Sequence, residues 1–369
     1  MGKSAEKRRG FDHILYGLWG LAAAGLCIWC AAGALRPVLA EKGEGWLLHM
    51  AGLTAAAETP SPVFSPPPSL LPENIAALFP GEVDAPAAPR QERLPQPVST
   101  PDPARETGTV EVLKMSVGQK VKNFTVKDET GTGLDLEKEL ETGPSLSVKK
   151  DGTPVVLLYS THTTESFILE GDGSWYYRDD DFRTRDPESN IVCVAAEAKK
   201  VIEAGGFGVI HDTTVHDDPA YSGSYNRSME TIRKNLEKYP TIQITVDVHR
   251  DAFGESGAVR YKPVAQVNGK QAAQMMILTG CDTAEDSVFP NWKENLRFAL
   301  KLQQKGETMF PGLYRSLYFC RRNYNMHATR GSLLVEVGTD VNTLEEAKYS
   351  GRLLGETVLA VLEDLAREA

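Results

Sequence analysis

The sequence lacks the features that mark nucleic-acid binding or a disulfide-stabilised fold. Its 50 acidic residues outnumber its 40 basic ones, which gives a formal net charge of -10 and a pI of about 5.3. No lysine- or arginine-rich run occurs in the globular part, so we expect no nucleic-acid partner. Of the five cysteines, Cys27 and Cys30 lie in an apolar run where burial in lipid is expected, and Cys193, Cys281 and Cys320 are scattered singly, without metal-ligand spacing. They therefore predict neither a cysteine metal site nor a disulfide framework.

Three common catalytic signatures are also missing. The chain contains no HExxH, no Gly-x-Ser-x-Gly and no P-loop pattern. These motifs mark a large group of zinc proteases, the α/β-hydrolases and the P-loop nucleotidases. No such pattern therefore competes, as a candidate site, with the histidines and carboxylates of residues 153–369.

Near the N-terminus, an uncharged stretch is long enough to cross a membrane. Residues 14–35 form a run of 22 residues without a charged side chain, and about 20 such residues span the hydrocarbon core as a helix. Residues 1–13 carry four lysines and arginines and are expected to stay in the cytoplasm. We predict a single-pass membrane protein with an uncleaved anchor and an extracytoplasmic C-terminal part. A cleaved signal peptide is the alternative.

A proline-rich segment follows this predicted transmembrane helix. Thirteen prolines lie between Pro60 and Pro103. Proline removes a backbone donor and interrupts helices, so this stretch cannot build a core. We predict that residues 36–108 form a disordered extracytoplasmic linker. Residues 109–152 are ambiguous, either strands or an adapter, and residues 153–369 form the main domain.

From residue 153 onward, the apolar pattern alternates between strands and helices. Apolar runs predict strands at residues 154–159, 207–210, 241–248 and 332–337. Helical spacing predicts helices at residues 190–204, 225–239 and 292–305. Asn268-Gly269 predicts a hairpin between strands near residues 264–267 and 275–278. Thr343 and Glu346 fit a capping box that opens a C-terminal helix. The expected fold class is α/β, with a mostly parallel sheet and helices on both faces.

Polar residues follow or end three of the predicted strands. Residues 161–166 read THTTES, residues 247–251 read DVHRD, and residues 335–338 read VEVG. In parallel α/β sheets, ligands bind beyond the carboxyl ends of the strands. We therefore expect these three segments to meet at one edge of the sheet.

The residue types in these segments fit a catalytic zinc site. Such a site needs three nitrogen or oxygen ligands and keeps a fourth position for water. We predict that His162, His249 and Glu165 bind Zn²⁺, which lowers the pKa of its water and polarises a substrate carbonyl. Glu336 stands in an apolar strand where burial of a carboxylate is costly, so we predict that it is the general base. Asp247 could orient a ligand imidazole.

The third ligand and the substrate contacts are less constrained by this pattern. Asp186, just before a predicted helix, rivals Glu165 as the third ligand. Arg250 is the candidate for binding a substrate carboxylate, although a surface pair with Asp251 would also account for it. His216 is the best candidate for a histidine that lines the substrate site.

Four sequence blocks together resemble the stage II sporulation protein P family. They are HTTESF at residues 162–167, DTTVH with YSGSY within residues 212–225, DVHRDA at residues 247–252 and EVGTDVNT at residues 336–343. The similarity covers roughly residues 150–366. This family is similar to zinc-dependent N-acetylmuramoyl-L-alanine amidases, and its members are associated with amidase and endopeptidase cleavage of peptidoglycan.

The resemblance implies specific roles for residues of this chain. His162 and His249 carry over as zinc ligands and Glu336 as the catalytic glutamate. The third ligand would be a glutamate near the start of the following helix, where this chain offers Asp186 or Glu188.

The resemblance also implies a substrate and a setting. The bond cleaved would be the amide between N-acetylmuramic acid and the stem peptide, with peptide cross-links as a second target. The chain would act in forespore engulfment during sporulation, between the mother-cell and forespore membranes. Stage II sporulation proteins D and M would be its partners.

Two other functions are compatible with the same residues. A zinc carboxypeptidase that trims wall peptides also uses an H-x-x-E turn, a distant histidine and a later glutamate. Arg250 would then grip a terminal carboxylate bidentately. A non-enzymatic wall-binding scaffold would retain a degenerate site. The complete set of predicted ligands and base favours the hydrolase.

Overall fold

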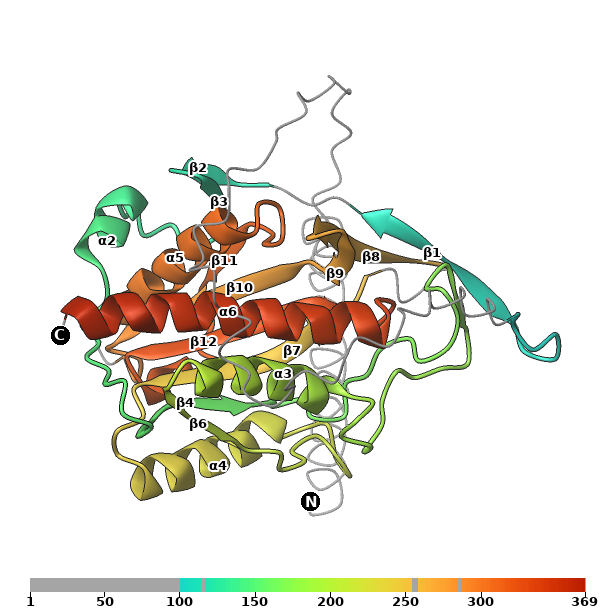
Figure 1. Ribbon diagram of the computed structural model, residues 1–369, viewed down its shortest axis with the longest axis horizontal. Helices are drawn as coiled ribbons and strands as arrows, with labels where there is room; N and C mark the ends of the chain where they lie inside the picture. Colours follow the sequence, from blue (N-terminus) through green and yellow to red (C-terminus); the bar gives the residue numbers. More distant parts are fainter. Residues whose placement is uncertain (1–99, 114–116, 254–257, 285–286, 369) are drawn as a thin grey trace, which may run out of the picture. The chain divides into compact units, whose positions relative to one another are not determined.

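The computed structural model describes residues 100–113, 117–253, 258–284 and 287–368. Within them, strands and helices alternate along most of the chain (Figure 1). The strands are β1 (Thr107–Leu113), β2 (Gln119–Val121), β3 (Phe124–Asp128), β4 (Pro154–Tyr159), β5 (Trp175–Tyr177), β6 (Gly208–His211), β7 (Ile244–Asp251), β8 (Val259–Val267), β9 (Lys270–Ala273), β10 (Met275–Gly280), β11 (Leu317–Cys320) and β12 (Gly331–Thr339). The helices are α2 (Leu136–Thr142), α3 (Ile191–Ala204), α4 (Ser224–Lys238), α5 (Trp292–Met309), η2 (Met326–Ala328) and α6 (Leu344–Glu368).

The predicted cytoplasmic segment, transmembrane helix and most of the predicted linker lie outside the described residues. Within the linker range, Thr107 and Gly108 already belong to β1. In the part of the chain that the structure describes, no helix is both long and apolar enough to span a membrane. The ambiguous region 109–152 supplies the rest of β1 together with β2, β3 and α2, and β3 pairs with β11 of the main domain.

The central sheet has eight strands in the order β2-β3-β11-β10-β12-β7-β4-β6. Neighbours from β12 to β6 are parallel, but β10 runs antiparallel to β12, and β2 runs antiparallel to β3. A second sheet, in the order β5-β1-β8-β9, also contains both kinds of pair. The α/β fold is confirmed, whereas the prediction of a mostly parallel sheet is wrong because both sheets are mixed.

A hairpin in the second sheet comes directly before β10. Asn268 and Gly269 have φ values of 50° and 75°, as a two-residue turn with positive φ at both positions requires. The turn joins β8 to β9, with Val267 opposite Lys270. The hairpin prediction is thus confirmed, but its second strand is Lys270–Ala273 and not residues 275–278. β10 starts at Met275, without the helical crossover that parallel neighbours need.

The two faces of the central sheet are covered differently. On one face, alternate apolar residues such as Val246 and Val248 join a large core with α3, α5 and α6. Figure 1 shows α6 lying along the sheet between α3 and α5. On the other face, Leu157 and Tyr159 of β4 pack with Ile232 of α4 in a smaller cluster. Strand alternation therefore sends Asp247 and His249 of β7 toward the face that α4 covers.

Two of the helices, α3 and α6, begin where the sequence provides side-chain caps. Asn190 Oδ1 accepts a hydrogen bond of 2.9 Å from Val192 N at the start of α3. At the start of α6, Thr343 Oγ1 accepts from Glu346 N at 3.2 Å, and Glu346 Oε2 accepts from Thr343 N at 3.0 Å. This reciprocal pair is the predicted capping box.

Candidate functional site

The predicted site residues meet at the carboxyl ends of three neighbouring strands. β12, β7 and β4 lie side by side in parallel. Tyr159 at the end of β4 pairs with Asp247, and Glu336 of β12 pairs with His249. His162 lies three positions beyond the end of β4. The three segments therefore meet at one edge of the sheet, as expected from the apolar strand patterns that marked where each strand ends.

Hydroxyl groups fold the turn that carries His162. Thr161 N donates to Asp247 Oδ1 at 2.8 Å, and Thr161 Oγ1 donates to Asp247 Oδ2 at 2.6 Å. Thr163 Oγ1 donates to the carbonyl of Ser160 at 2.7 Å. Local bonds of this kind are why Ser and Thr favour turns. The buried carboxylate of Asp247 thus fixes the turn against β7.

His162 is buried among aromatic rings. Its imidazole stacks on Tyr221 with ring centroids 4.3 Å apart and lies edge-on to His249 at 5.1 Å. Its Nδ1 lies 3.4 Å from the hydroxyl of Ser224. Burial, with the nearby His249 and Arg183, lowers the pKa of His162 to about 3. The imidazole is therefore neutral at pH 7, as a metal ligand must be.

His249 is surrounded by carboxylates. Its Nε2 lies 2.9 Å from Asp247 Oδ1, and its Nδ1 lies 3.6 Å from Glu165 Oε2. Burial alone would lower the pKa of His249, but Asp247, Glu165 and Glu336 raise it to about 10. The surroundings of this ring therefore favour positive charge. The contact with Asp247 is the one expected of a carboxylate that orients a ligand imidazole.

Among the candidates for third ligand, the structure brings Glu165 to the histidines. Glu165 is buried beside His249. Asp186 and Glu188 are exposed in the segment before α3. Asp186 Oδ2 accepts from the hydroxyl of Ser189 at 2.6 Å, and Asp186 Oδ1 accepts from Glu188 N at 3.2 Å. Asp186 thus stabilises a turn.

Glu336 faces the same side of the sheet as His249. Residues paired across parallel strands point the same way, and these two are paired. Glu336 Oε2 is buried and has no hydrogen-bond partner among the described residues. Burial, together with the carboxylate of Asp251, raises the pKa of Glu336 well above its usual range. A carboxyl group in this state is suited to exchanging a proton near neutral pH.

A β-bulge follows Glu336. The register between β12 and β7 shifts between Glu336 and Thr339. Gly338 has a φ of 63°, and a Cβ at this position would lie 2.4 Å from Asn342 Oδ1. Glycine is therefore required here. Regular pairing stops immediately after the predicted base, as bulges beside active sites commonly arrange.

The donor atoms fit a zinc ion by type and partly by position. Across the described ranges, no three histidine, cysteine, aspartate or glutamate side chains already converge on one metal position. His249 Nδ1 and Glu165 Oε2 are 3.6 Å apart. Two ligands of one tetrahedral zinc ion, each at about 2.0–2.2 Å, lie about 3.3–3.5 Å from each other. His162 completes a set of two imidazoles and one carboxylate.

Arg250, predicted to bind a substrate carboxylate, is used by the protein itself. The residue is only 9% exposed. Its Nε donates to the carbonyl of Ser166 at 3.1 Å, and its Nη2 donates to the carbonyl of Phe182 at 3.0 Å. Its backbone N donates to Glu165 Oε2 at 3.2 Å. Arg250 therefore holds the segment that carries Glu165, and its guanidinium does not face a ligand.

His216, predicted to line the substrate site, lies in the interior. Its exposure is 1%. Nδ1 lies 2.9 Å from the carbonyl of Ser160, and Nε2 lies 2.9 Å from the hydroxyl of Thr231. With both ring nitrogens engaged, His216 supports the turn before His162.

The sequence did not single out Arg183, which lies next to the predicted metal ligands. Its Nη2 is 4.0 Å from Glu165 Oε1, and its guanidinium lies over the ring of Tyr221 at 5.1 Å. Arg183 stands in an irregular segment with several other charged residues, so no periodicity marks it. Only the contact between distant segments reveals it.

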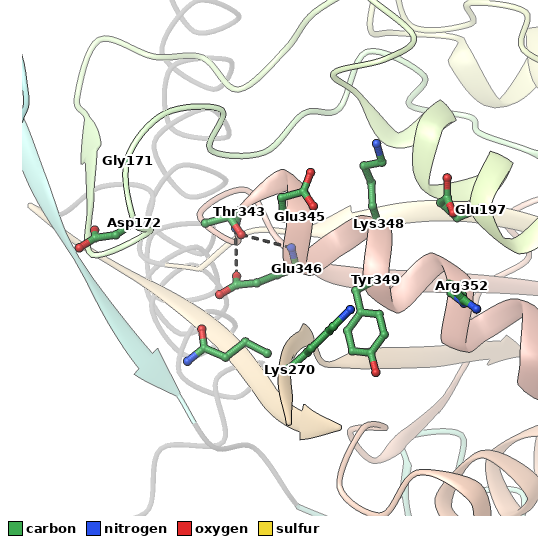
Figure 2. Close-up of a pocket in the computed structure, with 11 residues that line it drawn as sticks. Gly171, Asp172, Glu197, Lys270, Thr343, Glu345, Glu346, Lys348, Tyr349 and Arg352 are labelled. Carbon is green, nitrogen blue, oxygen red and sulfur yellow. Dashed lines mark hydrogen bonds between the residues drawn. The ribbon is translucent and has the colours of Figure 1, made fainter. Parts of the chain in front are cut away.

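A separate cavity of about 590 Å³ lies at the start of α6 (Figure 2). Its lining includes Lys270 of β9 together with Thr343, Glu346 and Lys348. Beneath it, Lys262 Nζ donates to Glu346 Oε1 at 2.8 Å. None of the predicted site residues is among the described residues that line this cavity.

Comparison with solved structures finds bacterial amidases of low similarity. The CwlD amidase from Clostridioides difficile, in complex with the GerS lipoprotein, is 12% identical over 58% of this chain and 100% of its own, with a TM-score of 0.37. The amidase AmiC2 of Nostoc punctiforme is 12% identical over 58% of this chain and 99% of its own, with a TM-score of 0.31. Similarity at this level carries no functional assignment.

Sequence comparisons give a clear family. No curated protein matches the chain. The family model described as stage II sporulation protein P matches residues 91–359. That match includes every predicted metal ligand and the predicted base, and it covers well over half of the chain. The chain therefore belongs to the stage II sporulation protein P family.

Proposed function

We propose that this chain is a zinc-dependent N-acetylmuramoyl-L-alanine amidase that hydrolyses peptidoglycan during sporulation. The observation that carries the proposal is the position of Glu336: its Oε2 atom is buried without a hydrogen-bond partner among the described residues and lies on the strand beside His249. An unpartnered buried carboxylate is costly, and a perturbed carboxyl group beside candidate ligands marks a functional site. Family membership points to the wall polymer as the substrate.

Each residue of the site has a role in this proposal. His162, His249 and Glu165 would hold the zinc ion, which when bound polarises the scissile carbonyl and makes water a stronger nucleophile. Asp247 orients the His249 imidazole through Nε2. Glu336 takes a proton from the attacking water at Oε2 and delivers it to the nitrogen of the leaving amine.

The contacts of Arg250 do not support the role that the carboxypeptidase alternative gave it. That alternative relied on Arg250 to bind a terminal carboxylate. The Arg250 guanidinium instead donates to the carbonyls of Ser166 and Phe182. Cleavage of peptide cross-links stays within the proposal as a second activity of the same site.

The setting of the reaction is also a proposal. An anchor at residues 14–35 and a proline-rich linker would place the domain outside the cytoplasm, where the wall polymer is found. Forespore engulfment, and stage II sporulation proteins D and M as partners, follow from the sequence resemblance. Co-purification of the full-length chain with those proteins from sporulating cells, compared with vegetative cells, checks this part.

The activity itself is tested with the full-length chain, zinc and purified peptidoglycan. An amidase releases intact stem peptides with a new N-terminal alanine and leaves glycan strands free of peptide. Release of single C-terminal residues would identify a carboxypeptidase and contradict the proposal. A scaffold would bind the wall without soluble products. Glu336→Gln should abolish release while wall binding persists, and Asp186→Asn serves as the matched control.

A further inference from the structure

Arg183 lies at the rim of the predicted metal site. It stands between β5 and α3, and its backbone forms an isolated antiparallel bridge with Glu165. Its side chain is 33% exposed, whereas Arg250 is buried and occupied by backbone carbonyls. Arg183 is therefore the guanidinium beside Glu165 that solvent and substrate can reach.

One end of the Arg183 guanidinium is fixed. Its Nη1 donates to Asp217 Oδ2 at 2.8 Å and to Thr164 Oγ1 at 3.2 Å. The Asp217 side chain is fully buried and also accepts from the backbone N of Thr164 at 3.1 Å. Because Asp217 is itself held in place, the plane of the guanidinium has a defined orientation.

The other edge of the guanidinium makes only a long ion pair, with Glu165. Within the described part of the chain, neither Nε nor Nη2 of Arg183 donates a hydrogen bond, and Nη2 stays 4.0 Å from Glu165 Oε1. The group lies over the Tyr221 ring, which in turn stacks on His162. Tyr221 is 57% exposed. Nε and Nη2 together form the two-donor fork that matches a carboxylate.

We propose that Arg183 binds a free carboxylate of the substrate, near the scissile amide, through Nε and Nη2. This inference rests on the proposed function, because the carboxylate is taken to belong to the peptide of a muramoyl peptide. The distance from Arg183 to Glu165 Oε1 is 4.0 Å, and one extended residue spans about 3.3–3.6 Å. For an amide bound beside Glu165, a carboxylate one or two residues away from the scissile bond therefore lies within reach of the fork.

A purely structural arginine would be arranged differently. Arg185 provides the comparison, because it is two positions away, 67% exposed and paired with Asp218 at the surface. Its charge is paired with Asp218, whose side chain is 32% exposed. Arg183 uses one nitrogen for support and leaves two donors beside them.

The test uses two synthetic N-acetylmuramoyl-L-alanyl peptides that differ in one group. The second residue is glutamate with either a free α-carboxylate or a carboxamide. The full-length zinc-loaded chain should prefer the carboxylate roughly tenfold to hundredfold in kcat/KM, since hydrogen bonds to a charged group are worth that much. Arg183→Gln should remove the preference. Arg183→Lys should keep part of it, because the charge remains and the fork is lost.

Arg185→Gln is the matched control and should keep the full preference. Thermal unfolding of each variant reports damage to the fold, and the ratio of the two substrates is independent of the fraction of active protein. If Arg183→Gln slows both peptides equally and keeps the preference, Arg183 only braces the loop and the inference is overturned.

Failure of the proposed function has a different signature. If the wild type cleaves neither peptide, or releases only C-terminal residues, the amidase is contradicted. Isothermal titration of the two peptides then decides the role of Arg183 by itself. Tighter binding of the carboxylate peptide that disappears in Arg183→Gln supports carboxylate recognition. Equal binding of both peptides overturns it.

Discussion

The molecule contains two clusters of buried charge that are built in opposite ways. At the start of α6, Glu346 Oε1 accepts from Lys262, and its Oε2 accepts from the side chain of Asn342 at 2.8 Å and from Thr343 N. At the ends of the central strands, Glu336 Oε2 has no partner among the described residues. Both oxygens of Glu346 therefore accept hydrogen bonds, whereas one oxygen of Glu336 has no partner among the described residues.

The difference separates a structural charge from a reactive one. A buried carboxylate with a full set of donors is held in one state and stabilises the geometry around it. A carboxylate with a buried oxygen that accepts no hydrogen bond is easier to protonate, and burial together with the nearby carboxylate of Asp251 raises the pKa of Glu336. The cavity above Glu346 (Figure 2) is larger than a side chain, but the residues of the proposed active site belong to the other cluster.

Glu336→Gln is the strongest test of the difference between the two carboxylates. The amide keeps the shape but cannot take a proton, so kcat should fall about 10²- to 10⁴-fold. The fold should be unaffected because Glu336 Oε2 makes no hydrogen bond to a described residue. Turnover on purified peptidoglycan and circular dichroism measure both effects. A variant that retains a third of wild-type activity would exclude Glu336 as the base.

The opposite result is expected for Lys262→Met. This change leaves Glu346 buried without its cation, which should lower the free energy of unfolding by about 3–5 kcal/mol. Activity per folded molecule should stay near that of the wild type, since Lys262 touches none of the predicted site residues. Urea unfolding combined with a turnover assay on the folded protein checks this. A selective loss of turnover with unchanged stability would reverse the roles that we assign to the two clusters.

Zinc should raise the free energy of unfolding only through the cluster that contains His249 and Glu336. At about 100 times its dissociation constant, zinc should raise the free energy of unfolding by about 2.7 kcal/mol. A chelator should remove this stabilisation together with the activity. His249→Ala should show no zinc-dependent shift in Tm, while Lys262→Met should show the full shift from its lower baseline. Differential scanning calorimetry with and without zinc gives the comparison, and a full shift in His249→Ala would place the metal elsewhere.

The smallest effect is expected for Asp186→Asn. Asp186 is exposed and bonded to Ser189 and Glu188, so zinc affinity should stay within about twofold and stability should change by about 0.5 kcal/mol or less, as is usual at the surface. Glu165→Gln, by contrast, should weaken zinc binding strongly. Competition with a zinc-sensitive dye measures both. Weaker binding in Asp186→Asn would restore Asp186 as the third ligand.

The sequence predicted much of the fold because local patterns determined it. The apolar run before His162 gave β4 with its bounds, and the helical stripe after Asn190 gave α3. The ends of the predicted strands indicated the edge of the sheet at which the candidate residues meet. The sequence also placed a strand where β10 lies, but the neighbours of β10 could not be obtained in this way, because an apolar run does not state which strands it will join or in which direction.

The roles of the two arginines show the same limit. Arg250 follows a histidine at a strand end, so its sequence position suggested that it binds a substrate carboxylate. Its actual partners, the carbonyls of Ser166 and Phe182, lie more than sixty residues away in the chain. Arg183 had no signal, since its closeness to Glu165 depends on how two irregular segments cross. Residue types suggested that an arginine takes part in the proposed site. Tertiary contacts determine which arginine has donors available beside Glu165.

The bulge after Glu336 determines where β12 can gain a residue without turning the Glu336 side chain to the other face of the sheet. Inserting one residue in β12 before Glu336 would turn the carboxylate to the opposite face of the sheet, among the apolar side chains of the core. An extra residue after Glu336 falls where the register with β7 already shifts, and it leaves the carboxylate facing His249. Natural relatives are therefore expected to vary in length after this glutamate and not before it, which a comparison of their sequences can check.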